Sequence, residues 1–104
     1  ESEEVRAYGS ALHVLYKAFW DRAIATKLTP HGTSLSTDKK LGILKVTYQQ
    51  RQYPVLQIDS ADGGKSFTFL EKRNRFMKVP DFVTQEILDL VKEDAMKDAR
   101  FVKM

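Results

Sequence analysis

The sequence predicts an α+β fold, a two-layer sandwich in which two helices cover one face of a three- to four-stranded antiparallel sheet. Apolar residues recur every three or four positions near both ends of the chain and alternate with polar residues in between. The connections between the alternating segments are too short for the crossover that parallel strands need. With 104 residues, of which 42% are hydrophobic and 30% charged, the chain is long enough to bury one core. We therefore expect residues 1–104 to form a single α+β domain.

The first expected element is a long amphipathic helix from about Ser2 to Lys27. Ser2 is placed to cap the first turn, and two glutamates follow it where the helix dipole favours negative charge. The helix ends before Pro30, because proline cannot continue the hydrogen-bond ladder. Its apolar stripe, widened by aromatic residues, consists of Val5, Tyr8, Leu12, Leu15, Tyr16, Phe19, Trp20, Ala23 and Ile24.

The middle of the chain predicts strands. Residues 29–40 are polar and rich in turn-forming residues, so we expect a flexible loop there. Beyond this loop the apolar period changes to two, which is typical of half-buried strands. Pro54 cannot donate to a strand ladder, which favours an edge position or a strand start. We expect strands at 41–49, 53–59 and 66–71, and a short fourth strand at 76–79.

A second amphipathic helix is expected after Pro80. Asp81 is placed to cap its first turn. The predicted apolar face consists of Val83, Ile87, Leu90, Val91 and Ala95.

The stretch SADGGKSF, residues 60–67, ends like a phosphate-binding P-loop with Gly64, Lys65 and Ser66. The first glycine that such a loop requires is replaced by Asp59, and the residues that follow alternate like a strand. Asp62-Gly63 between two alternating apolar segments is instead a strong signal for a hairpin turn. We therefore predict a turn without phosphate chemistry.

The sequence offers little support for catalysis or for a metal site. Cysteine is absent, which excludes thiolate ligands and cysteine nucleophiles. His13 and His31 lack a second histidine or carboxylate at the spacing that helical metal sites use. No nucleophile motif surrounds the serines. We expect no enzymatic activity, no cofactor and no metal.

Charge is segregated along the chain. Residues 39–78 contain nine basic and three acidic side chains, whereas residues 81–98 contain six acidic and two basic ones. Basic and aromatic residues interleave in FTFLEKRNRFMK, residues 67–78, and such a surface could neutralise phosphates and stack bases. RNA or another nucleic acid is therefore the alternative partner, contacted by Lys45, Arg51, Lys65, Lys72, Arg73, Arg75 and Lys78.

The leading functional hypothesis is a non-enzymatic protein-interaction or assembly module, which self-associates or docks into a larger complex. Such a module would use an open sheet edge or a helix face, assisted by the opposite charges of the sheet region and the second helix. The expected contact residues are Trp20, Ile24, Glu86, Asp89 and Glu93.

The sequence also bears on location. Its longest apolar segments fall short of the roughly 20 residues that span a bilayer. The absence of cysteine argues against a small secreted disulfide scaffold, so we expect an intracellular protein in the cytoplasm or an organelle matrix. Because the chain begins with Glu1 and not with methionine, we expect a trimmed or processed form.

Overall fold

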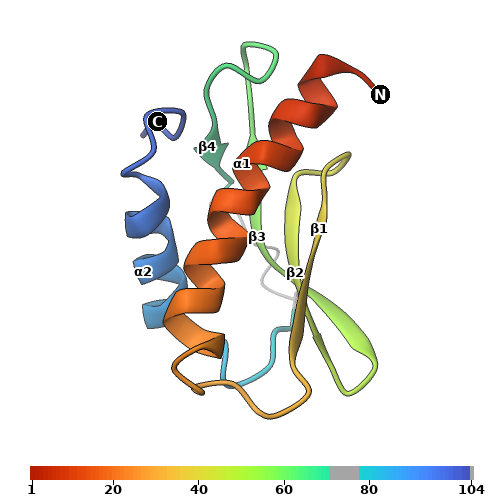
Figure 1. Cartoon of the computed structure of the whole chain (residues 1–104), viewed down its shortest axis with the longest axis vertical. Helices are drawn as coiled ribbons and strands as arrows, with labels where there is room; N and C mark the ends of the chain where they lie inside the picture. Colours follow the sequence, from red (N-terminus) through yellow and green to blue (C-terminus); the bar gives the residue numbers. More distant parts are fainter. Residues whose placement is uncertain (71–77, 104) are drawn as a thin grey trace.

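The computed structural model, which describes residues 1–70 and 78–103, places two helices over one face of a four-stranded antiparallel sheet (Figure 1). The strands follow one another in the order β1-β2-β3-β4. This arrangement confirms the predicted α+β fold. The elements are α1 (Glu3–Phe19), the π-helical turn η1 (Trp20–Ile24), β1 (Ser34–Asp38), β2 (Ile43–Tyr48), β3 (Arg51–Asp59), β4 (Thr68–Phe69) and α2 (Gln85–Ala95).

Helix α1 begins and packs as its sequence predicts. The Ser2 hydroxyl accepts a hydrogen bond from the backbone N–H of Val5 at 3.1 Å, which satisfies one of the free donors of the first turn. Leu12, Leu15 and Phe19 recur at helical spacing and are fully buried in the core between the helices and the sheet.

The loop expected over residues 29–40 is wrong for its second part, because Ser34–Asp38 forms β1. Leu35 is the only apolar residue in this strand, and it is buried opposite Val46 of β2. The backbone of β2 supplies the pairing that the side chains of β1 do not predict. The following turn is closed by the Asp38 carboxylate, which accepts from the N–H groups of Lys40 and Leu41 at 3.0 Å each. Strand β2 accordingly begins at Ile43 and not at residue 41.

Pro54 lies inside β3, so the expected position at a sheet edge or a strand start is wrong. The register between β2 and β3 shifts at this point: Leu44 pairs with Leu56, and Lys45 pairs with Pro54. Val55 is the extra residue of a β-bulge, where a missing ladder donor is tolerated. The bulge also lets Val55 and its neighbour Leu56 both be buried.

A strand is expected at 66–71, and among its described residues, 66–70, the two residues of β4 form a strand and pair with Ile58 and Asp59. Phe67 and Phe69 are buried in the core, as predicted for the aromatic residues of this segment. Part of the predicted fourth strand at 76–79 falls outside the described residues, and the described part, 78–79, is not a strand. The fourth strand of the sheet is instead β1, at the opposite edge.

Helix α2 is capped by Thr84 and not by Asp81. The Thr84 hydroxyl accepts from the N–H of Ile87 at 3.2 Å, because the preceding residues form a turn in which Val83 N–H donates to the Pro80 carbonyl. The predicted face is correct for Ile87, Val91 and Ala95, whereas Leu88 is buried in place of the half-buried Leu90. Leu88 lies about 60° around the helix from Val91 and Leu90 about 100°, so Leu88 is nearer the centre of the stripe.

The segment SADGGKSF forms the loop between β3 and β4, and its hydrogen bonds show whether it could bind phosphate. The Asp62 carboxylate accepts from the backbone N–H groups of Lys65 and Ser66, at 3.0 and 2.9 Å, and from the hydroxyls of Ser60 and Ser66. These bonds hold the pKa of Asp62 far below its usual range. The amides that a phosphate would need are therefore occupied by a carboxylate of the chain itself. The loop connects two strands, as the hairpin prediction requires.

The positive φ angles of this turn fall on Gly63 and Gly64 and not on Asp62. Gly64 also packs directly on α1, because a Cβ at this position would lie 2.7 Å from the Cβ of Ala7. The loop therefore fixes the N-terminal half of α1 over the sheet.

This packing yields a test of stability. We expect Gly64→Ala to destabilise the fold by more than Gly32→Ala, although both glycines have positive φ angles of +99° and +88°. Left-handed strain alone costs about 1–2 kcal/mol. Gly32 has open space around it, so Gly64→Ala adds the clash with Ala7. Urea unfolding of both variants measures the difference, and equal losses would contradict the contact.

Candidate protein-interaction surface

Three aromatic side chains form a row along the outside of α1. His13, Tyr16 and Trp20 are three and four residues apart, so they lie on one stripe of the helix. The rings of His13 and Tyr16 stack with centroids 6.4 Å apart, and those of Tyr16 and Trp20 stack at 6.5 Å with planes 6° apart. Trp20 is 43% exposed and His13 is exposed as well, while Tyr16 also contacts the core. The row is an ordered apolar surface in contact with water.

This aromatic row faces the β1 side of the molecule. Gly9 precedes His13 by one turn on the same stripe, and a Cβ at Gly9 would lie 3.4 Å from Lys39, the residue after β1. Ser10, about 100° around the helix from Gly9, accepts from the Arg100 guanidinium at 2.8 Å, so the C-terminal segment occupies the neighbouring side of α1. Figure 1 shows the same arrangement, with β1 and α2 on opposite sides of α1.

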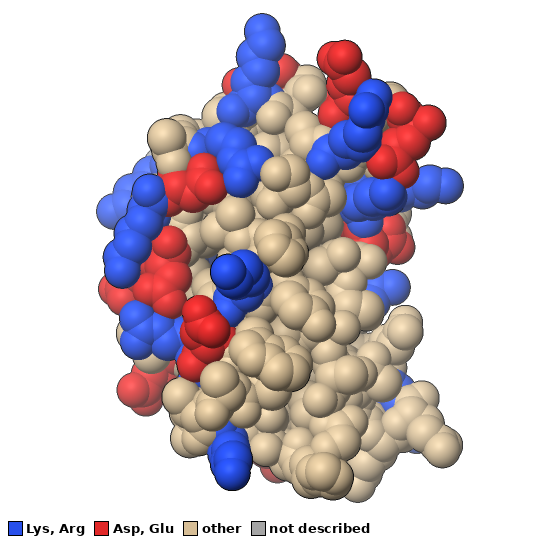
Figure 2. All heavy atoms as spheres, viewed as in Figure 1, with Lys and Arg blue, Asp and Glu red and all other residues tan. Residues whose placement is uncertain are grey.

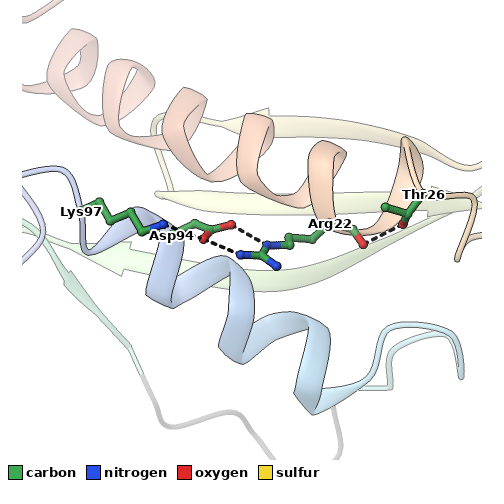
Figure 3. Close-up of polar contacts among 4 residues, drawn as sticks. All are labelled: Arg22, Thr26, Asp94 and Lys97. Carbon is green, nitrogen blue, oxygen red and sulfur yellow. Dashed lines mark hydrogen bonds and ion pairs between the residues drawn. The ribbon is translucent and has the colours of Figure 1, made fainter.

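A π-helical turn carries the end of the aromatic row. The N–H of Ala25 donates to the carbonyl of Trp20 at 2.7 Å, five residues back, as the wider π turn requires. In the same turn, Thr26 Oγ1 donates to the Arg22 carbonyl at 2.8 Å (Figure 3). The turn presents Trp20 to solvent and Arg22 to α2.

An ion pair fastens this turn to α2. Arg22 Nε and Nη2 donate to the two carboxylate oxygens of Asp94 at 2.8 and 3.0 Å, and Lys97 Nζ lies 3.7 Å from the same carboxylate (Figure 3). The hydrogen bonds from Arg22 lower the pKa of Asp94, and the nearby cations reinforce the effect. The position of Trp20 is thus tied to the second helix through its neighbour Arg22.

The two edges of the sheet differ in whether another segment of the chain pairs with them. Next to β4, the Phe67 N–H donates to the Arg100 carbonyl at 2.7 Å and the Val102 N–H donates to the Phe67 carbonyl at 2.9 Å. The C-terminal segment therefore adds a parallel bridge that covers this edge. Among residues 1–70 and 78–103, no segment pairs with the outer edge of β1. A bare strand edge presents unpaired N–H and C=O groups.

Apart from Asp38 at its end, β1 lacks most of the devices that usually discourage pairing. Its register with β2 is uninterrupted over five residues, so β1 contains no bulge. It also contains no proline or lysine, and residues 28–37 carry no Lys, Arg, Asp or Glu. Figure 2 shows charged side chains gathered along the top and left of this face, while a broad area from the centre to the lower right carries few. We call the aromatic row of α1 together with β1 the α1–β1 surface.

The structure separates the protein-interaction residues that the sequence predicts. Trp20 belongs to the α1–β1 surface, and the half-buried Ile24 lines a hollow beside it with Pro30 and His31. Asp89 and Glu93 line a different depression, between α2 and Phe69, and Glu86 is exposed in the first turn of α2. The expected contact residues therefore do not lie together: Asp94 of α2 pairs with Arg22 of η1, whereas Asp89 and Glu93 line the depression beside Phe69.

The basic residues do not gather into one described patch. Arg51 begins β3, which is about 26 Å long, and Lys65 lies in the loop that follows the far end of this strand. Lys45 lies 3.9 Å from Asp38 across the β1–β2 ladder, and Lys78 is exposed. Lys72, Arg73 and Arg75 lie outside the described residues. Nucleic-acid binding stays a prediction from the sequence.

Other site chemistry is not found in the described part of the chain. No three His, Asp or Glu side chains there come together as a metal-binding group. No helix in those ranges is long and apolar enough to cross a bilayer. Comparisons with protein-family models, curated proteins and solved structures find no match to this chain.

Sequence reasoning missed β1 as a strand and did not connect His13, which is exposed, with Tyr16 and Trp20. Two signals could have indicated the α1–β1 surface: the spacing of the three rings on one stripe, and the uncharged run of residues 28–37. The rings lie on the side of α1 that contacts Lys39. No local sequence pattern predicts this contact between α1 and the residue after β1.

The Arg22–Asp94 pair predicts a pH dependence of stability. The pKa of Asp94 is lower in the folded protein than its usual value of 3.8, so its stabilisation is complete above about pH 4 and is lost as the pH falls through the folded-state pKa. We expect Asp94→Asn to lower the thermal midpoint at pH 7 by less than about 4 °C, since both partners are partly exposed. The difference from the unsubstituted chain should shrink below pH 4. A difference that grows with acid would contradict this assignment.

Proposed function

We propose that this chain is a non-enzymatic protein-interaction module that binds its partner through the α1–β1 surface. The single observation that carries the proposal is a difference between the two sheet edges: the C-terminal segment bridges to Phe67 beside β4, whereas no segment among residues 1–70 and 78–103 pairs with the outer edge of β1. Unpaired backbone groups on a regular strand favour the addition of another strand.

The aromatic row supports the same conclusion. Tyr and Trp side chains are enriched at protein interfaces, because each supplies a large contact area with little loss of conformational freedom. The stacked rings of Tyr16 and Trp20 are held by the helix, and Trp20 is anchored through η1. One basic and one acidic side chain, Lys17 and Asp21, line the hollow that holds the three rings, so the row has no excess of positive charge, which favours a protein partner over a polyanion.

Site-specific photo-crosslinking tests this function. A benzophenone amino acid is placed at Thr37 or His13, which are exposed on the α1–β1 surface, and at Glu86 or Asp89, which are exposed on α2. We expect protein adducts from the first pair in living cells and few from the second. The α2 positions act as matched controls, because they are equally accessible sites on the same folded chain.

Two results would contradict the proposal. Adducts that form only from the α2 positions would move the interface to the acidic helix. Adducts that ribonuclease removes would favour the nucleic-acid alternative.

A further inference from the structure

We propose that the partner on the α1–β1 surface is a second copy of this chain. In this dimer, two β1 strands pair antiparallel across a two-fold axis, so that the two sheets join into one continuous sheet. The two aromatic rows lie on the helix side of the joined sheet. This inference rests on the proposed function and names its partner.

The chemistry of the edge specifies an extended backbone as its occupant. A strand edge alternates donors and acceptors at the spacing of a β-ladder, and another strand satisfies all of them. When two identical strands meet across a two-fold axis, they are necessarily antiparallel and each contributes the same residues. The uninterrupted register of β1 with β2 leaves β1 regular enough to accept this pairing.

The residues of β1 are compatible with pairing to themselves. A register with Ser36 on the axis pairs all five residues: Ser34 lies opposite Asp38 of the partner subunit, and Leu35 lies opposite Thr37 of the partner subunit. Asp38 is the only charged residue in the strand. In this register the two Asp38 residues of the dimer lie four positions, or about 13 Å, apart along the strands, beyond the screening length of about 8 Å at physiological salt.

Asp38 is also compensated within its own chain. Lys45 Nζ lies 3.9 Å from its carboxylate. Joining two copies therefore brings together neither two uncompensated charges nor two lysine-rich edges. Self-repulsion, the usual obstacle to a symmetric contact, is weak here.

The size of the contact sets the expected affinity. Five paired residues cover only part of the roughly 800 Å² that each partner buries in a stable interface. The exposed rings of His13 and Trp20 lie on the same side of the molecule and enlarge the contact. We therefore expect a reversible dimer with a micromolar dissociation constant, which is populated as the protein is concentrated.

Sedimentation equilibrium from low micromolar to near-millimolar protein tests the inference. The apparent mass should rise toward twice that of the chain. Thr37→Lys should keep the chain monomeric, because a lysine on an edge strand discourages pairing. Ala61→Lys is the matched control: it adds the same charge at an exposed loop position away from β1 and should leave the dimer intact. Circular dichroism confirms that both variants are folded.

Cysteine crosslinking tests the register. The chain contains no cysteine, so single substitutions report without background. Under mild oxidation, Ser36→Cys should form a disulfide-linked dimer. Ser34→Cys and Asp38→Cys should crosslink when mixed, and neither should do so alone. Trp20 is the only tryptophan, and its emission should shift to shorter wavelength on concentration.

The outcomes separate this inference from the proposed function. A chain that stays monomeric at every concentration overturns the dimer. If Thr37 still crosslinks to another protein in cells, the interaction module stands with a different partner. If it does not, both proposals fall. A dimer that persists in Thr37→Lys, or that crosslinks at none of the β1 positions, places the contact elsewhere and overturns the proposed pairing.

Discussion

The packing of α1 is the constraint on which the rest of the structure depends. One side of this helix buries Leu12, Leu15 and Phe19 against the sheet, and burying each such side chain contributes about 1.5–3 kcal/mol. A second side is held by α2 and the C-terminal segment through Arg22 and Ser10. The remaining side can only face outward, along β1. The aromatic row is therefore exposed because the other sides of the helix are in contact with the sheet, with α2 and with the C-terminal segment.

The same helix determines how the sheet is closed. The loop between β3 and β4 lies on the N-terminal half of α1, where Tyr8 donates its hydroxyl to Asp59 and accepts from the Ser60 N–H. Tyr8 also packs edge-on against Phe67, the residue that bridges to the C-terminal segment. Closing the β4 edge is therefore coupled to the position of α1. Within the described residues, no comparable segment reaches the β1 edge.

The sequence predicted the fold wherever the signal was local and repeated. The three-four spacing in α1 and the alternation in β2 each specify a buried face without reference to the rest of the chain. β1 has one apolar residue in five, and its pairing depends on the backbone of a neighbouring strand. Asp81 and Thr84 are both competent caps, and the turn at Pro80 decides between them. The bulge at Val55 likewise depends on how β3 pairs with Leu44 and Lys45 of β2, which no local pattern in β3 specifies.

The candidate surface was only partly predictable for a related reason. Trp20 and Ile24 are predictable as contact residues because the apolar stripe of the first helix is wide, and the structure shows Trp20 exposed and Ile24 half-buried. The acidic residues of α2 were grouped with them from charge alone. Helix geometry points those acidic side chains in two directions. Only the packed structure shows that Asp94 bonds Arg22 of η1, while Asp89 and Glu93 line the depression beside Phe69.

Charge that is segregated along the sequence does not become charge segregated on the surface. Some charges of the basic segment 39–78 and of the acidic segment 81–98 are paired with residues outside both segments: Asp94 with Arg22, Lys39 with Glu1, and Lys45 with Asp38. Exposed pairs of this kind contribute little to stability, but they reduce the field that a distant partner would sense. What the α1–β1 surface offers a partner is therefore backbone hydrogen bonding and aromatic area. Both contributions act at contact distance. The backbone groups favour a partner with a regular strand edge, and the aromatic area favours a protein partner.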